Sequence, residues 1–281
     1  MKLKILLILL SLAIQSKPII AKEIINWYHS NSPPFVILRG LEQGKGTIDM
    51  IIAFYQKRMP EYNHRDLMSN LPRFVYNVKN REKWCHAWML KTPEREKFLY
   101  YSDPVSLVLP NHLIIKKEKF SAIDNKQIVS LENIFKKSKL KGRLIRSRSY
   151  GKKIDLLINQ YKNSSNIKLV TQKEKQILEM LLLNRIDYTI TYPVTAEYWA
   201  YQLNANEKLL IIPIEETQAV NKGYISCAKT AWGQKVIQRI NQIVQKEKYN
   251  PEYRKLVTEL WLSSNASKRM QKFYDQLLLG K

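Results

Sequence analysis

The sequence contains few of the residues that mark several classes of protein. Its 281 residues include two cysteines, eight glycines and eleven prolines. Two cysteines are too few for a small disulfide-rich protein, and no cluster of cysteine and histidine has the spacing of a zinc site. The low glycine and proline content excludes a collagen-like or low-complexity chain. Beyond the N-terminus, no stretch is apolar over the roughly twenty residues that a membrane-spanning helix needs.

The chain does contain enough apolar residues for a folded core, together with a strong positive charge. Hydrophobic residues make up 45% and aromatic residues 10%, and 47 Lys and Arg against 24 Asp and Glu give a net charge of +23. The length fits one large domain or two modest ones. In the cytoplasm this charge would indicate a nucleic-acid partner, but no nucleic-acid-binding motif accompanies it, and we predict none. The densest basic stretch, residues 136–153, either meets an anionic ligand or is a solvated face.

The N-terminus has the three-part form of a secretory signal. Residues 1–4 form a short basic start, residues 5–14 are apolar apart from Ser11, and Ala21 is a small residue that suits cleavage. We therefore predict a cleavable signal peptide over residues 1–21 and export, most simply into a bacterial periplasm. The apolar run is too short to remain as a membrane anchor. Cleavage would remove three lysines and no acid, which lowers the net charge from +23 to +20.

Predicted strands and helices alternate along the rest of the chain. Residues 23–28 and 84–90 have strand character, and residues 48–58 carry apolar side chains at helical spacing. This alternation predicts an α/β architecture with parallel sheets. It occurs in two sets, which the extended stretches 106–115 and 209–223 join.

Four short motifs follow one another in the order found in a known protein family. They are Trp27 with Pro33-Pro34-Phe35, Gly46 and Asp49; Thr92-Pro93-Glu94-Arg95 with Tyr101-Ser102-Asp103-Pro104; Ser130-Leu131-Glu132-Asn133-Ile134 with Leu140-Lys141-Gly142-Arg143-Leu144; and Leu182-Leu183-Asn184-Arg185-Ile186-Asp187. The set resembles the periplasmic solute-binding proteins of family 3, which include many amino-acid receptors of ABC importers. Each motif is weak alone, but together they span nearly the whole mature chain.

The resemblance implies the two-lobed periplasmic-binding-protein fold of type II. Each lobe would be a mostly parallel sheet flanked by helices, and two crossover strands would join the lobes around a ligand cleft. The first lobe would comprise residues 22–112 and 216–281, and the second lobe residues 113–215. The implied function is capture of a small polar, carboxylate-bearing ligand, without catalysis, cofactor or metal. The protein would be a monomer that delivers its ligand to an ABC permease in the inner membrane.

The resemblance also implies which side chains of the first lobe meet the ligand. Arg95 would grip a ligand carboxylate, because a guanidinium matches two carboxylate oxygens; alternatively it pairs with a neighbouring acid at the surface. Thr92 would offer its hydroxyl to the same group. Tyr28 and Phe35 would either lie against the ligand or belong to the core of the lobe.

In the second lobe, the candidates are Ser149, Tyr150 and Tyr192. Ser149 and Tyr150 precede a predicted helix whose free N–H groups would favour an anion, although Ser149 could instead only cap that helix. Tyr192 lies five positions after Asp187, where amino-acid binders of the family carry an acid. A phenol brings no negative charge, so a ligand ammonium would lack its counter-ion. We therefore expect a carboxylate without an amine, or another anion.

The two cysteines of the chain are Cys85 and Cys227. In the implied fold, Cys85 and Cys227 lie on neighbouring strands, where they either form a disulfide or remain two buried thiols.

An enzyme on the same fold, such as a dehydratase, would need a cleft acid and base, for which Glu42, Asp49 and Glu174 are available. No catalytic motif supports that alternative. A sensory or partner-binding pair of lobes without transport is the other alternative.

Overall fold

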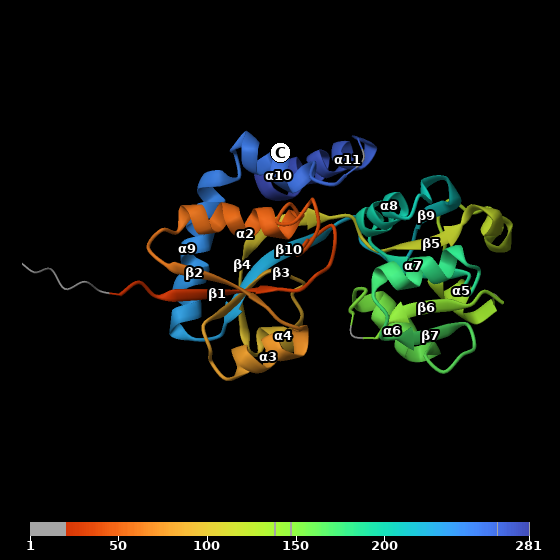
Figure 1. Ribbon diagram of the computed structural model, residues 1–281, viewed down its shortest axis with the longest axis horizontal. Helices are drawn as coiled ribbons and strands as arrows, with labels where there is room; N and C mark the ends of the chain where they lie inside the picture. Colours follow the sequence, from red (N-terminus) through yellow and green to blue (C-terminus); the bar gives the residue numbers. More distant parts are fainter. Residues whose placement is uncertain (1–20, 138, 147, 263, 281) are drawn as a thin grey trace, which may run out of the picture.

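The computed structural model describes residues 21–137, 139–146, 148–262 and 264–280. Almost all of the predicted signal peptide therefore lies outside the described residues. Within the described ranges, no helix combines the length and apolarity needed to cross a membrane. The described chain forms two bodies that lie side by side, each built around one sheet (Figure 1).

Each body contains a five-stranded sheet, and the two sheets have matching layouts. The first sheet has the order β2-β1-β3-β10-β4, formed by β1 (Ile24–His29), β2 (Asn63–Met68), β3 (Trp84–Met89), β4 (Leu99–Val108) and β10 (Asn221–Ala228). The second has the order β7-β6-β8-β5-β9, formed by β5 (His112–Lys116), β6 (Gly142–Ile145), β7 (Ile167–Val170), β8 (Tyr188–Thr191) and β9 (Leu209–Pro213). In each sheet four strands run in the same direction and one runs in the opposite direction. The reversed strand is the one that follows a crossing between the lobes, β10 in the first sheet and β5 in the second. The predicted α/β architecture is confirmed.

Helices cover both sheets. Those of the first lobe are α2 (Thr47–Arg58), α3 (Leu71–Lys79), α4 (Pro93–Glu96), α9 (Ala231–Glu247), α10 (Pro251–Thr258) and α11 (Ser264–Tyr274), followed by a π-helical turn, η3 (Asp275–Leu279). Those of the second lobe are α5 (Leu131–Lys137), α6 (Lys152–Tyr161), α7 (Glu174–Leu182) and α8 (Pro193–Gln202), with two short 3-10 segments, η1 (Lys117–Ile123) and η2 (Asn206–Lys208). The C-terminal helices α10 and α11 lie over the first lobe near its junction with the second (Figure 1).

The chain passes between the sheets at two short connections. The prediction of one continuous strand over 106–115 is wrong, because β4 ends at Val108 and β5 begins at His112. Pro110 lies between them and has no N–H group to continue a strand ladder. The return connection spans residues 214–220, within the predicted stretch 209–223, which also includes β9 and the first residues of β10.

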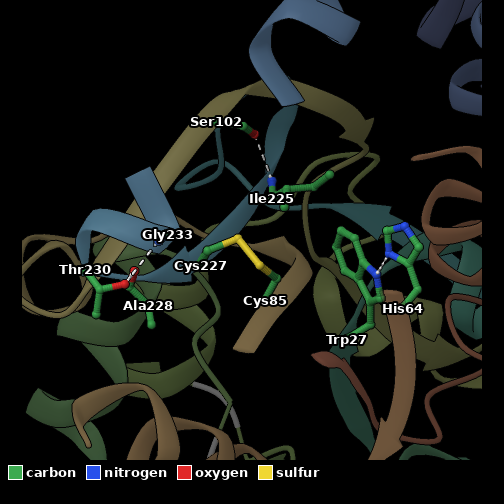
Figure 2. The surroundings of a disulfide bond; sticks show 9 residues. All are labelled: Trp27, His64, Cys85, Ser102, Ile225, Cys227, Ala228, Thr230 and Gly233. Atoms are coloured by element: carbon green, nitrogen blue, oxygen red, sulfur yellow. Dashed lines mark hydrogen bonds between the residues drawn. A yellow bond between two sulfur atoms is a disulfide. The ribbon is translucent and has the colours of Figure 1, made fainter. Parts of the chain in front are cut away.

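The core of the first lobe contains a disulfide between Cys85 and Cys227. These residues face each other on β3 and β10, and their sulfurs are 2.03 Å apart. Figure 2 shows the bond at the centre of the sheet, with the Trp27 indole nearby donating a hydrogen bond to His64 Nδ1 at 3.1 Å. Both cysteines and Trp27 are fully buried. The lobe is thus held together at a point well inside its sheet.

Candidate functional site

A cavity of about 330 Å³ lies between the two lobes. Side chains of both lobes line it. The first lobe contributes Tyr28, Ser30, Ser32, Phe35, Val36, Ile48, Leu71, His86, Trp88, Met89, Leu90 and Arg95, and the second contributes Ile145, Arg148, Ser149, Glu174 and Tyr192. This size is at the lower end of the range for small-molecule sites, about 300–1,000 Å³.

Arg95 lies on the first-lobe wall of this cavity, on the short helix that follows β3. Thr92 caps this helix by accepting the N–H of Arg95 at 3.4 Å, and Pro93 occupies its first turn. The half-buried guanidinium donates to the carbonyl of Leu90 at 2.9 Å. Among the described residues it has no carboxylate partner. Arg95 therefore brings a positive charge and further N–H donors to the cavity. Thr92, in contrast, caps the helix and does not line the cavity.

Three aromatic rings meet across the lobes at the cavity. Phe35 and Trp88 of the first lobe stack with ring centroids 5.9 Å apart. The ring of Tyr192, from the second lobe, meets Phe35 edge-on at 5.5 Å and Trp88 at 5.9 Å. Gly223 on β10 makes room for the indole, because a Cβ at this position would overlap it. For Trp88, the sequence left open whether its ring belongs to the core or narrows the pocket.

Tyr28 lies at the first-lobe wall beside His86. Their rings stack at 4.8 Å, and the Nδ1 atom of His86 accepts the N–H of Trp88 at 3.0 Å. Burial lowers the pKa of His86 to about 3, and the positive charges of Arg95 and His29 act in the same direction. His86 is therefore neutral, with its proton assigned to Nε2. His86 thus adds a neutral imidazole to the cavity lining, and it was not among the ligand-binding residues predicted from the sequence.

The second-lobe wall carries an arginine with many partners. The Nη1 atom of Arg148 donates to Glu174 Oε1 at 2.6 Å and to Thr191 Oγ1 at 3.0 Å, and Nη2 donates to Asn111 Oδ1 at 2.8 Å. The guanidinium carbon also lies 4.6 Å from the ring centroid of Tyr192. These partners come from the first crossing between the lobes, from β8 and from the start of α7. Arg148 is thus fixed in place by the protein itself.

Ser149 and Tyr150 do not form the open anion site that the sequence suggested. Asp155, in the first turn of α6, accepts the Ser149 hydroxyl at 2.6 Å and the Tyr150 N–H at 2.7 Å. The chain's own carboxylate therefore takes the place expected for an anion. Ser149 still lines the cavity, whereas the buried Tyr150 does not and its hydroxyl accepts the N–H of Ile145 at 2.7 Å.

Of the three acids that were candidates for the acid and base of an enzyme, one lines the cavity. Glu174 is the one acidic side chain among the described residues that line it. Glu42 pairs with Lys45 at 3.1 Å on the surface. Asp49 does not line the cavity and pairs instead with His29. Among the described residues, no group of three or more His, Cys, Asp and Glu could hold a metal ion.

A cluster of ionisable side chains outside the cavity lining joins His29, Asp49 and Asp66. The His29 ring lies 3.6 Å from Asp49 Oδ1 and 3.0 Å from Asp66 Oδ1. Burial lowers the pKa of His29, but the hydrogen bonds and charges of the two carboxylates outweigh it and raise the pKa to about 9. Asp49 also accepts the N–H groups of Ile37 at 2.8 Å and Gly46 at 3.1 Å. The cluster therefore fixes the loop that presents Phe35 to the cavity.

Comparisons with known proteins agree at the level of the fold. No family model and no curated protein matches the sequence. A solved structure described for glutathione import through GshT and the cystine ABC importer TcyBC of Streptococcus mutans has a TM-score of 0.69 at 14% identity, over 89% of this chain and 100% of that chain. The amino-acid ABC transporter substrate-binding protein AbpA from Streptococcus pneumoniae, bound to L-arginine, has a TM-score of 0.63 at 15% identity, over 88% and 96%. A histidine kinase sensor domain similar to periplasmic binding proteins has a TM-score of 0.66 at 12% identity, over 85% and 96%.

The chain has the two-lobed periplasmic-binding-protein fold. At these identities the likeness establishes the fold alone. The neighbours include both binding proteins of ABC importers and sensor domains. In this periplasmic-binding-protein fold the cavity lies between the lobes, and both of its walls carry an arginine.

Proposed function

We propose that this protein captures a small carboxylate-bearing solute in the cavity between its lobes. The observation that carries the proposal is Arg95, a half-buried cavity cation without a carboxylate partner among the described residues. A guanidinium presents parallel N–H donors that match a carboxylate bidentately. The rings of Phe35, Trp88 and Tyr28 would contact the apolar part of the solute.

The proposal includes the setting in which the protein works. A signal peptide over residues 1–21 would direct it to the periplasm, where it would act as a monomer and pass its solute to an ABC permease of the inner membrane. Residues 22–111 and 216–281 would form the first lobe and residues 112–215 the second, because β5 of the second sheet begins at His112 rather than one residue later. The likeness to the binding proteins of ABC importers supports this setting.

Thermal unfolding with a ligand panel tests the proposal. The mature chain, residues 22–281, is heated with amino acids, 2-oxo acids, dicarboxylates and inorganic anions. A solute at a hundred times its Kd stabilises the folded state by about 2.7 kcal/mol, a shift of several degrees in Tm. The shift should disappear in Arg95→Met and persist in the control Arg65→Met, since Arg65 is an exposed residue of β2 that does not line the cavity. The absence of any shift across the panel, or a shift that survives Arg95→Met, would contradict the proposal.

A sensory role is the second candidate, and the C-terminal segment favours it. Trp261, just after α10, donates its indole N–H to the carbonyl of Lys45 in the first lobe at 2.8 Å. The same ring meets Tyr198 of α8, in the second lobe, edge-on at 5.6 Å. A change in the angle between the lobes would therefore reach the C-terminal helices. In a sensor, ligand binding should alter the fluorescence of the wild-type protein by an amount that Trp261→Phe removes, whereas a passive contact would give equal changes in both proteins.

A further inference from the structure

The second-lobe wall of the cavity holds an ion pair that bears on which solutes can enter. Glu174 is the one acid among the described lining residues, and Arg148 lies beside it on the same wall. A cation transferred into a partly dehydrated cavity needs a counter-ion or a set of hydrogen-bond acceptors to offset its lost hydration. A solute carrying an ammonium group would therefore depend on Glu174.

Glu174 is already engaged. Its Oε1 atom accepts from Arg148 Nη1 at 2.6 Å, and the two side chains are 26% and 13% exposed. Arg148 cannot easily turn away, because Thr191 and Asn111 hold its two terminal nitrogens and the ring of Tyr192 lies 4.6 Å from its guanidinium carbon. The carboxylate is thus neutralised, and a fixed positive charge stands next to it. Both features disfavour an ammonium group at this wall.

The charges of the lining also indicate what would fit. Arg95 and Arg148 are positive, Glu174 is negative and His86 is neutral, so the described lining carries one net positive charge. One carboxylate bound at Arg95 would balance it. An α-amino acid would add a third cation to a lining whose one described carboxylate is already paired with Arg148, and a dicarboxylate would add a second anion facing Glu174.

We propose that Arg148 is the residue that makes the cavity select amine-free monocarboxylates, such as 2-oxo acids, over α-amino acids. The inference rests on the proposed function, because it takes the carboxylate at Arg95 as given. Arg148 acts by neutralising Glu174 and by placing its own charge where an ammonium group would lie. It is a specificity-determining residue, since the same carboxylate can bind with or without it.

Calorimetric titration with matched pairs of ligands tests the inference. Each pair is an α-amino acid and the 2-oxo acid with the same side chain, so the two differ at the amine position alone. The wild-type protein should bind the 2-oxo acid at least about tenfold more tightly than the amino acid. This is the ratio expected when the ammonium group gives up one charge-assisted hydrogen bond on entering the cavity. Arg148→Met should shift the ratio toward the amino acid by about tenfold or more, because it frees Glu174. The double variant Arg148→Met/Glu174→Gln should lose this gain.

Controls separate specificity from folding. Arg146→Met removes an exposed arginine two positions away that does not line the cavity, and it should leave the ratio unchanged. Thermal unfolding of each variant establishes that it is folded. If Arg148→Met fails to fold, Glu174→Gln provides the test, since an unpaired Arg148 should then improve binding of a dicarboxylate relative to a monocarboxylate by about tenfold.

The possible results are distinguishable. Equal binding of the two ligands by the wild-type protein, or an unchanged ratio in a folded Arg148→Met, would overturn the inference while leaving the capture of carboxylates by Arg95 intact. With Glu174→Gln as the variant, an unchanged preference between dicarboxylate and monocarboxylate has the same meaning. Failure of the wild-type protein to bind any carboxylate would overturn both proposals.

Discussion

The two lobes each present an arginine to the same cavity, but they support it differently. Arg95 of the first lobe donates to one backbone carbonyl, that of Leu90. Arg148 of the second lobe donates to three side chains, one of them the carboxylate of Glu174. An arginine without a carboxylate partner is available to a ligand, whereas an arginine bonded to three side chains of the protein, one of them a carboxylate, belongs to the structure and sets the polarity of the wall. An arginine in the cavity lining is therefore not a ligand-binding group by its type and position alone. The hydrogen bonds that it already makes to the protein also decide whether it can bind a ligand.

The contrast extends to what stabilises each lobe. The first lobe is stabilised by contacts that lie outside the cavity lining, namely the disulfide in its sheet and the cluster of His29 with Asp49 and Asp66. In the second lobe the wall itself is a network of bonded side chains centred on Arg148. Substitutions at the wall should therefore separate binding from stability in the first lobe and combine them in the second.

The largest effect on stability should come from the disulfide. The double variant Cys85→Ser/Cys227→Ser opens a loop of 142 positions, and the chain-entropy model assigns such a loop about 4–5 kcal/mol of the free energy of unfolding. Urea unfolding of the variant and the wild type measures the loss. Because both cysteines lie outside the cavity lining, carboxylate affinity of the folded variant should not change. A large drop in affinity would show that the disulfide of the first lobe also determines the geometry of the ligand-binding cavity.

The next effect should come from Arg148→Met. Removing one partner of a largely buried ion pair leaves the other uncompensated, which costs about 3 kcal/mol. Adding Glu174→Gln should recover part of this loss, because the remaining side chain is then neutral. Urea unfolding of the two variants gives the difference. A single variant as stable as the wild type would mean that the second-lobe wall is not a supporting network.

A smaller effect should appear as a dependence of stability on pH. The folded-state pKa of His29 is about 9, above the ordinary value near 6.5. Stability from this group is therefore fully present below about pH 6.5 and is lost as the pH rises toward 9, by on the order of 2 kcal/mol. Unfolding at pH 6.5, 7.5 and 9 should show this decline in the wild type and a flatter profile in His29→Gln. Equal profiles would remove the cluster from the support of the first lobe.

The smallest effect on stability should come from Arg95→Met. The side chain has no carboxylate partner among the described residues, so the free energy of unfolding should change by less than about 1 kcal/mol. The variant should nevertheless lose the stabilisation by carboxylates. Thermal unfolding with and without ligand measures both quantities. A strongly destabilised Arg95→Met would place this arginine with Arg148 as a structural residue.

Much of the architecture was predictable from the sequence, because it depends on local patterns. The alternation of strands and helices predicted two α/β sets, and the ordered motifs indicated how they are arranged. The break at residues 109–111 was missed, although Pro110 provided a local signal for it. The competing role of Asp155 was also readable, since an acid in the first turn of a helix commonly satisfies the N–H groups there.

The second-lobe wall could not be read from the sequence. Arg148 meets side chains from positions 111, 174 and 191, which the strand order brings together. Nothing in the local sequence distinguishes this arginine from its neighbours in the basic stretch. Trp88 and His86 line the cavity for a similar reason, since the twist and pairing of β3 decide which of its side chains face the second lobe.

The most direct test of the account is calorimetric titration of one 2-oxo acid into the wild-type protein, Arg95→Met and the double variant Arg148→Met/Glu174→Gln. We predict that the ligand binds the wild type, that Arg95→Met abolishes binding, and that the folded double variant retains it with an affinity within about tenfold of the wild type. Binding that survives Arg95→Met but disappears in the folded double variant would refute the assignment of the carboxylate to Arg95, because the second lobe would then hold it.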